Sequence, residues 1–430
     1  MKRYLIDKLV EWKNSEDRKP LILSGARQVG KTWLMMEFGK KYYKNIAYIT
    51  FYNNNRFKKV FEDDYDIKRI ISNIEIETNI SVDIHDTLIV FDEIQECPKA
   101  LESLKYFCEN AKEYNIIAAG SLLGVFLHEN ISFPVGKVDE ITLYPMNYFE
   151  FLEACGEDKL CSELLNKNFN IIGDFKEKYI DLLKKYYYVG GMPEVVNEFV
   201  KNKNYDKVRE KQNAILNQYV NDFSKHIKGI ELGRVNQIWN SIPSQLLKEN
   251  KKFIFNNIKN GARYKEFDIA IEWLRKSGLI YVINRITAPK IPLKSYAEVS
   301  IFKIFLVDVG LLSALSEIDI KTLLDGNNIF VEFKGALAEQ YVVEQLISMY
   351  NKNLFYYISD NNYYEIDFLM SINNEILPIE VKFGYNTKSK SLKYFIEKYN
   401  SKYAYKLSLN NCNATDKIRN IPLYALNLIE

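Results

Sequence analysis

The stretch LILSGARQVGKT, residues 21–32, decides how the N-terminal part of the chain folds. Its first residues form an apolar burst of strand length, and residues 33–43 after it have a helical pattern. The loop between them fits G-x-x-x-x-G-K-[ST] without a gap, and such a loop wraps backbone N–H groups around a phosphate. We therefore predict that a phosphate is bound by Gly25, Ala26, Arg27, Gln28, Val29, Gly30, Lys31 and Thr32.

Individual residues of this loop have separate expected roles. Gly25 and Gly30 allow a tight turn and a close approach of backbone to phosphate. Lys31 is expected to bridge the β- and γ-phosphates, and the hydroxyl of Thr32 to bind Mg²⁺. Arg27 either contacts phosphate or pairs with a surface carboxylate. The cofactors predicted from the loop are a nucleoside triphosphate and Mg²⁺.

An apolar strand at residues 87–91 leads into two carboxylates, Asp92 and Glu93. Asp92 is placed to hold Mg²⁺, and Glu93 to orient and activate the attacking water. A solvated acidic pair at a strand end is the alternative, but the preceding phosphate loop favours the functional interpretation. The strand at residues 115–119 leads to Ser121, which either senses the γ-phosphate from between the two motif strands or belongs to an ordinary turn.

Composition restricts the class of protein. The chain has 430 residues, with 47% apolar and 27% charged residues, which excludes disordered and collagen-like classes. Its 58 basic and 56 acidic side chains give a net charge of +2, so no overall basic field indicates nucleic acid or a membrane. Five cysteines without a C-x-x-C pair favour a reducing compartment. We expect a cytoplasmic protein with no membrane partner.

Three regions follow from the distribution of apolar runs. Residues 1–145 alternate short apolar bursts with helical segments, which predicts an α/β domain with a mainly parallel sheet. Residues 146–300 are mostly helical, and a helix at 264–276 followed by a strand is consistent with a winged helix. Strands return in residues 301–430, around a helix at 335–350.

Four residues in the last region could form a second site. Glu339 lies on the predicted helix, Asp367 on a strand, and Glu380 and Lys382 on one face of the next strand. A hairpin would bring Asp367 beside Glu380, in a pattern similar to the D…E-x-K set of metal-dependent nucleases. There Asp367 and Glu380 would hold Mg²⁺, Glu339 would complete the metal shell, and Lys382 would position or deprotonate water. Alternating charge on a polar strand face, without DNA cleavage, is the alternative.

Together these motifs resemble a family of prokaryotic AAA-type P-loop ATPases whose C-terminal part is domain of unknown function 4143. The resemblance covers nearly the whole chain and is carried, in this order, by LILSGARQVGKT, TLIVFDEIQ, AAGS, LYPMNYFEF, YYVGGMPEVV, KIFLVDVGLLSAL and KGALAEQYVVEQL. It implies ATP as the nucleotide, a catalytic-glutamate ATPase core and a PD-(D/E)xK, restriction-endonuclease-like C-terminal fold. Family members usually carry Gly-Arg before the LYPMNYFEF-like segment, whereas this chain has Gly136-Lys137 and lacks that guanidinium.

Three functions remain open from the sequence. The leading one is a Mg²⁺-dependent ATPase that couples its nucleotide state to a nuclease-like C-terminal domain. The second is an ATP-regulated DNA nuclease. The third is a switch that binds ATP without hydrolysing it, and whose partner is DNA, another protein or a second copy of the chain.

Overall fold

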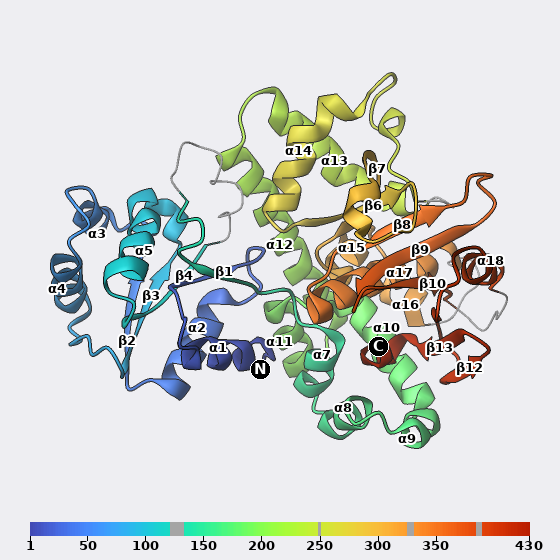
Figure 1. Cartoon of the computed structure of the whole chain (residues 1–430), viewed down its shortest axis with the longest axis horizontal. Coiled ribbons are helices and arrows are strands. Elements are labelled where there is room, and N and C mark those ends of the chain that lie inside the picture. The colour runs from blue at the N-terminus through green and yellow to red at the C-terminus, as the bar shows by residue number, and fades with distance from the viewer. Residues whose placement is uncertain (121–132, 248–250, 325–330, 384–388) are drawn as a thin grey trace. The chain divides into compact units, whose positions relative to one another are not determined.

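The structure is a computed structural model that describes residues 1–120, 133–247, 251–324, 331–383 and 389–430 (Figure 1). The chain divides into two compact units. The N-terminal unit consists mainly of residues 2–144, and the C-terminal unit mainly of residues 145–275 and 279–430. Within the described residues, no helix has the length and apolar character needed to cross a membrane.

A sheet of five parallel strands forms the centre of the N-terminal unit, and this confirms the predicted α/β class. The strand order is β2-β3-β4-β1-β5. The predicted strand at residues 115–119 is β4, and its place between β1 and β3 is confirmed. The strands are β1 (Leu21–Ser24), β2 (Asn45–Thr50), β3 (Thr87–Asp92), β4 (Asn115–Ala119) and β5 (Asp139–Thr142).

Successive strand residues point to opposite faces of the sheet, so apolar strands such as these need helices on both faces to cover them. Ile22, Ile89 and Ile116 pack in one apolar core with Ile70 of α4 and Leu104 of α5. The alternate strand residues Leu88, Val90 and Ile117 are buried as well, so both faces are covered, as in most parallel sheets. The helices of this unit are α1 (Leu5–Asn14), α2 (Lys31–Tyr42), α3 (Asn55–Lys58), α4 (Ile67–Thr78) and α5 (Pro98–Asn110), with short 3₁₀ turns η1 (Lys59–Phe61) and η2 (Ile94–Glu96).

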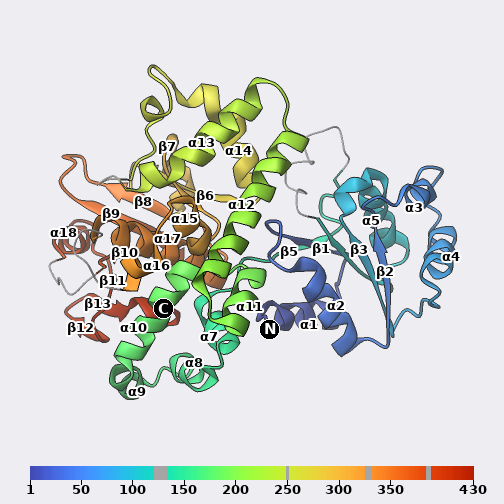
Figure 2. The ribbon, with the colours of Figure 1, turned by 180° about the vertical axis from the view of Figure 1, so that it is seen from behind.

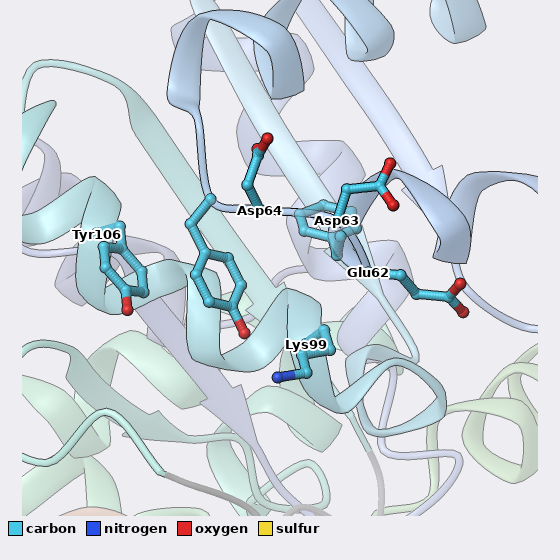
Figure 3. A pocket seen from close by; sticks show the side chains of 7 residues that line it. Glu62, Asp63, Asp64, Lys99 and Tyr106 are labelled. Atoms are coloured by element: carbon cyan, nitrogen blue, oxygen red, sulfur yellow. The ribbon is translucent and has the colours of Figure 1, made fainter.

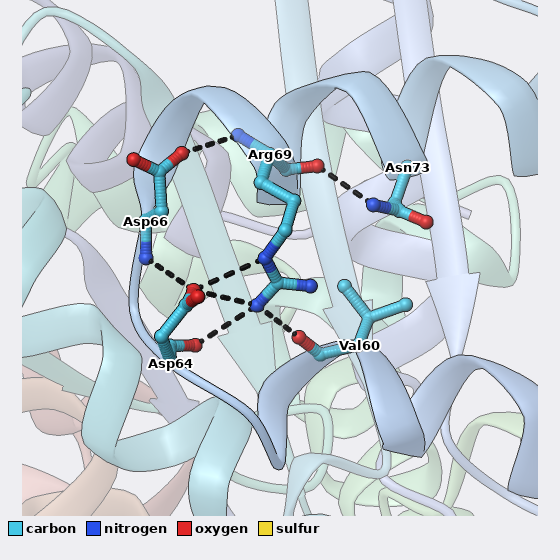
Figure 4. Close-up of polar contacts among 5 residues, drawn as sticks. All are labelled: Val60, Asp64, Asp66, Arg69 and Asn73. Carbon is cyan, nitrogen blue, oxygen red and sulfur yellow. Dashed lines mark hydrogen bonds and ion pairs between the residues drawn. The ribbon is translucent and has the colours of Figure 1, made fainter.

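A polar network fixes the start of α4 (Figure 4). The Asp66 side chain accepts a hydrogen bond from the Arg69 backbone N–H at 2.7 Å, which caps the helix. The Arg69 guanidinium donates to Asp64 Oδ1 at 2.7 Å and to the Val60 carbonyl at 2.8 Å. These bonds hold the segment between η1 and α4 in one conformation.

The first part of the C-terminal unit is helical, as the sequence predicts. Buried tyrosines form much of its core, and Tyr148, Tyr186 and Tyr341 meet with their rings edge to face. Its helices are α7 (Tyr148–Ala154), α8 (Asp158–Leu165), α9 (Phe169–Asp174), α10 (Lys176–Val189), α11 (Pro193–Asn202), α12 (Tyr205–His226), α13 (Ile230–Leu246) and α14 (Tyr264–Lys276), with the 3₁₀ turn η3 (Phe255–Asn257).

A mixed sheet of eight strands follows, in the order β12-β13-β11-β10-β9-β8-β6-β7 (Figure 2). The strand expected after the helix at 264–276 is β6, and it pairs with β8 in this sheet. Residue 300, where we predicted a boundary, falls inside β7. The strands are β6 (Ile280–Ile286), β7 (Ala297–Leu306), β8 (Phe355–Ile358), β9 (Glu365–Ile372), β10 (Glu375–Val381), β11 (Ala404–Ser408), β12 (Asn413–Thr415) and β13 (Ile418–Pro422).

The described residues of this part also form the helices α15 (Val309–Leu315), α16 (Ile320–Leu324), α17 (Val331–Tyr350) and α18 (Lys390–Tyr399) and the 3₁₀ segments η4 (Leu293–Tyr296) and η6 (Leu423–Leu428). The predicted hairpin is formed by β9 and β10, with Asn373 and Asn374 both at positive φ in its two-residue turn. Its register pairs Phe368 with Ile379, so Asp367 and Glu380 are brought to the same level of the sheet.

Candidate functional site

The predicted phosphate loop lies between β1 and α2, and its glycines are required by its shape. Gly25 has a φ of 136°, and a Cβ there would lie 2.2 Å from the carbonyl oxygen of Leu143. Gly30, with a φ of 94°, immediately precedes the helix, which begins at Lys31. Residues that carry a Cβ rarely adopt these backbone conformations, so the loop requires glycine at both positions.

Lys31 is buried inside its own loop. Its Nζ donates hydrogen bonds to the carbonyl oxygens of Gly25 and Ala26, each at 2.8 Å. Burial lowers the pKa of Lys31 to about 8, against the opposing effect of the Glu93 and Asp92 carboxylates, and Arg27 lowers it further. The ammonium charge is therefore poorly compensated, and a phosphate anion beside it would be stabilised.

Asp92, at the end of β3, receives hydrogen bonds from neutral groups. Thr32 Oγ1 donates to its Oδ2 at 2.7 Å, and the Tyr48 hydroxyl donates to the same oxygen at 2.9 Å. A hydroxyl beside a carboxylate is the kind of oxygen pair that Mg²⁺ binds, so Thr32 and Asp92 fit that ion. Sequence reasoning missed Tyr48, whose signal was its position on the strand next to the acidic one.

Glu93 follows Asp92 in a left-handed conformation, with a φ of 52°. Such a conformation is uncommon outside glycine and turns the chain sharply at the end of the strand. The amide of Gln95 donates a hydrogen bond to Glu93 Oε2, so the carboxylate is held by a neutral partner. Gln95 is buried and was not predicted as a site residue.

Other residues near the loop have contacts that the sequence did not predict. Arg3 is buried and donates to the carbonyl oxygens of Val29 at 2.9 Å and Tyr144 at 2.6 Å, which ties the loop to the segment after β5. Lys137 forms an ion pair with Glu109 at 2.9 Å. Ser121, the predicted γ-phosphate sensor, lies outside the described residues.

The four residues of the second predicted site lie in one cluster in the C-terminal unit. Lys382 Nζ is 3.1 Å from Glu380 Oε1, and Asp367 Oδ2 accepts a hydrogen bond from the Val381 N–H at 2.8 Å. Glu339, on α17, forms an ion pair with Lys251. Two more residues join them, because Lys303 of β7 lies 2.6 Å from Glu365 Oε1 and 4.0 Å from Glu339 Oε2.

Three family matches divide the chain. Residues 17–152 match the AAA domain, residues 180–322 match domain of unknown function 8612, and residues 334–428 match domain of unknown function 4143. The chain therefore contains an AAA P-loop domain, followed by domains of unknown function 8612 and 4143. No curated protein matches it.

Solved structures also match this AAA protein at low identity. A Walker-type ATPase of Pyrococcus abyssi is 14% identical, over 73% of this chain and 95% of that one, with a TM-score of 0.47. RuvB of Thermotoga maritima is 13% identical, over 64% and 88%, with a TM-score of 0.31. The Orc1 protein of Aeropyrum pernix, in complex with DNA, is 12% identical, over 73% and 90%, with a TM-score of 0.25.

Ion pairing dominates the cluster in the C-terminal domain of this AAA protein. Burial lowers the pKa of Lys303, but Glu365 and Glu339 more than offset this, so the pKa is raised above its usual value. Burial and the nearby Glu339 carboxylate raise the pKa of Asp367 to about 7, although Lys303 acts in the opposite direction. Glu339, Glu365 and Glu380 each pair with an ammonium group, whereas Asp92 and Glu93 of the AAA domain accept hydrogen bonds from neutral groups.

The same cluster does not fit a divalent cation in its present arrangement. Among the residues that the structure describes, no group of three or more His, Cys, Asp and Glu side chains is placed to hold a metal ion. Glu339, which was predicted to complete a metal shell, instead faces the ammonium groups of Lys251 and Lys303. The predicted nuclease chemistry therefore stays a prediction.

Two pockets in this AAA protein lie away from the predicted residues. The first, of about 430 Å³, is lined by acidic side chains with Lys99 and Tyr106 (Figure 3). The second, of about 720 Å³, lies among α12, α13 and α15–α16. Neither contains a residue of the phosphate loop or of the carboxylate cluster. The acidic lining of the first is also unfavourable for a phosphate.

Proposed function

We propose that the AAA domain binds Mg²⁺-ATP and hydrolyses it. The observation that carries this proposal is the buried Lys31 ammonium, which donates hydrogen bonds to two carbonyl oxygens and lies in the field of Asp92 and Glu93. A buried, poorly compensated cation is costly unless an anion completes it. A triphosphate that replaces the two carbonyl contacts would supply that anion.

Each remaining residue then has a chemical role. Backbone N–H groups of the loop and of the start of α2 bind the β-phosphate, and Lys31 bridges to the γ-phosphate. Thr32 and Asp92 would hold Mg²⁺, which neutralises charge on the phosphates when it is bound. Glu93, oriented by Gln95, accepts the proton of the attacking water. Ser121 contacts the γ-phosphate, and Arg27 adds positive charge at the loop.

We further propose that nucleotide state is coupled to the C-terminal unit. Arg3 supports this, because one guanidinium bonds both the phosphate loop at Val29 and the backbone at Tyr144, where the N-terminal unit ends. A shift of the loop on ATP binding would strain one of the two bonds. The segment that leads into the C-terminal unit would then respond to the nucleotide.

The test compares ATP binding and phosphate release by the full chain, its Lys31→Ala variant and the control Lys40→Ala, in which an exposed lysine of the same helix is removed. We expect the wild type and the control to bind and hydrolyse ATP, and Lys31→Ala to do neither well. Binding without phosphate release in the wild type would instead favour the non-hydrolysing switch. Absence of nucleotide binding in the wild type would overturn the proposal.

An ATP-regulated nuclease is not favoured, because the carboxylate cluster as arranged does not fit a divalent cation. Its test is incubation of plasmid DNA with the full chain, ATP and Mg²⁺ or Mn²⁺, beside the Asp367→Ala variant. We expect no nicking by either protein. Nicking by the wild type that Asp367→Ala abolishes would reinstate the nuclease.

A further inference from the structure

We propose that the larger pocket of the C-terminal unit binds an extended peptide segment that carries lysine or arginine side chains. The pocket has a volume of about 720 Å³, within the range of about 300–1,000 Å³ that is common for ligand sites. It lies where α12 packs against α13 and α15, and residues of α16 also line it (Figure 2). The proposal concerns the C-terminal unit alone and does not depend on ATP hydrolysis.

Arg209 of α12 supplies an unused hydrogen-bond donor in this pocket. Its Nη2 donates to the Ile318 carbonyl oxygen at 2.7 Å and to Ser313 Oγ at 3.3 Å, and its guanidinium carbon lies 4.4 Å from the centre of the Tyr188 ring. These contacts hold the guanidinium in place. Its Nη1 is buried and has no hydrogen-bond partner among the described residues, which is costly. A ligand with a carbonyl or carboxylate oxygen would satisfy this donor.

Two asparagines continue the stripe that Arg209 begins on α12. Asn213 and Asn217 follow it at intervals of four residues and line the same pocket. Residues four apart on a helix lie one above the other, at a distance of about 6 Å. An extended chain rises about 3.3 Å per residue, so every second peptide group recurs at about 6.6 Å. The spacing of the stripe therefore matches that of an extended peptide.

The chemistry of these side chains also fits a peptide. An asparagine amide has both an acceptor and a donor, so it can bond the N–H and the C=O of a peptide group. Asn240 of α13 adds a third amide to the lining. All three are exposed, and their side chains form no hydrogen bond with another residue that the structure describes. Val220 and Leu315, both half-buried, add apolar surface on which the stems of long side chains can pack.

The charge of the pocket favours a basic peptide. Its described lining holds the carboxylates of Asp206, Glu317 and Asp319. Against these three it holds one guanidinium, that of Arg209, so two negative charges are in excess. Asp319 interacts with this guanidinium, whereas Asp206 and Glu317 form no ion pair within the described part of the chain. Two cationic side chains would compensate these two carboxylates, and the phosphates of a nucleic acid would be repelled.

The experiment selects random octapeptides, displayed on phage, with the immobilised full chain. The library is first depleted on the double variant Asn213→Ala/Asn217→Ala, which removes peptides that bind elsewhere on the protein. Selected sequences are then measured as free peptides by fluorescence anisotropy. Both asparagines are exposed and alanine favours a helix, so this variant should fold, and circular dichroism with the thermal midpoint checks it.

Two further proteins complete the comparison. The double variant Asp206→Asn/Glu317→Gln removes the excess negative charge and keeps the size of both side chains. The control Gln237→Ala removes an exposed amide of α13 that does not line the pocket. No catalytic activity is needed for the readout.

We expect the wild type to select octapeptides with lysine or arginine at positions i and i+2, because alternate side chains of an extended chain point to the same side. Their affinity should fall at least about tenfold in the asparagine double variant, which loses two amides that bond the peptide. It should also fall in the carboxylate double variant, with a weaker dependence on salt. Gln237→Ala should bind them as the wild type does.

Two results would overturn the proposal. In the first, no peptide remains above background after depletion on the asparagine variant. In the second, the selected peptides are rich in Asp or Glu, or they bind the carboxylate double variant as tightly as the wild type. The pocket would then bind an anion through Arg209 rather than a basic segment.

Discussion

The two candidate sites hold their lysines in opposite ways. In the AAA domain, Lys31 is buried against the carbonyls of Gly25 and Ala26, while Asp92 is bonded by hydroxyls. In the C-terminal unit, Lys303 is paired directly with carboxylates. Both lysines are buried, yet the pKa of Lys31 is lowered to about 8 and that of Lys303 is raised.

We call the site around Lys31 the open site, because its charged groups are free to exchange their neutral partners for a ligand. We call the site around Lys303 the closed site, because its charged groups pair with each other. In the AAA domain, the lysine and the carboxylates form hydrogen bonds mainly with neutral groups. A ligand that carries both positive and negative charge, such as Mg²⁺-ATP, can replace those hydrogen bonds with stronger ionic contacts. Where lysine and carboxylates are bonded to each other, an added ion must first break an existing pair, which in a buried place is costly. The presence of Lys and Asp in a site is therefore less informative than the identity of their partners.

The largest expected effect tests whether the carboxylates of the open site perform chemistry. Glu93→Gln should still bind ATP, but its turnover should fall by roughly 10²–10⁴-fold, because a general base is removed. The control Glu96→Gln, which changes a residue paired with Lys58 at 3.6 Å, should keep its turnover. Steady-state phosphate release measures both. Full turnover by Glu93→Gln would exclude the assigned role.

The second largest effect is on the stability of the unit that contains the closed site. Lys303→Met leaves Glu365 without its ion-pair partner and Glu339 with Lys251 alone, so the free energy of unfolding of the C-terminal unit should fall by about 3–5 kcal/mol. Lys31→Met, the same substitution in the open site, should not destabilise the nucleotide-free N-terminal unit, because it removes a poorly compensated charge. Hydrogen exchange followed by mass spectrometry reports on each unit separately. Equal losses of stability in the two variants would contradict the difference between the open and the closed site.

A third effect is on nucleotide affinity. Lys31→Met should weaken ATP binding by about 10–100-fold, since hydrogen bonds to charged groups contribute roughly 1.5–3 kcal/mol. Lys303→Met should leave ATP affinity unchanged, provided that the protein is folded. Titration with a fluorescent ATP analogue measures the dissociation constants. Unaltered affinity in Lys31→Met would mean that its ammonium does not reach the phosphates.

The smallest effect is on pH dependence. The pKa of Lys31 falls from 10.5 to about 8 on folding, so between these values the folded N-terminal unit binds fewer protons than the unfolded chain. Its stability should therefore rise with pH from about 8 to 10.5 when no nucleotide is bound. Lys31→Met should remove this rise at amides of α2 measured by hydrogen exchange. If the stability of Lys31→Met rose with pH by the same amount, the pH dependence would belong to another titratable group.

Local patterns in the sequence predicted more of the open site than of the closed one. The strand, loop and helix around Gly25 and Lys31 are consecutive, so their spacing alone specifies their arrangement. Tyr48, Gln95 and Arg3 were missed, because they reach the site through strand pairing and side-chain contacts rather than through a motif. The place of β4 between the two motif strands was predicted together with the possible sensor role of Ser121, and the structure shows parallel pairing with both strands.

In the C-terminal unit, the same reasoning located Glu339, Asp367, Glu380 and Lys382, but it missed the two lysines that pair with Glu339. Lys251 and Lys303 lie 88 and 36 positions before Glu339, and no spacing rule connects residues so far apart. The placement of β6 and β7 in the large sheet was missed for a related reason. A strand that follows a helix is equally consistent with a wing and with the edge of a distant sheet.

The pairing of β6 with β8 in one sheet has a consequence for how such genes can be rearranged. The two family matches at residues 180–322 and 334–428 meet between strands of a single sheet, because β6 pairs with β8. A gene fragment that encoded only the second region would produce β8 with an open, apolar edge, which favours aggregation. The two families are therefore expected to be inherited as one unit, while recombination before residue 145 could exchange the ATP-binding part without dividing a sheet.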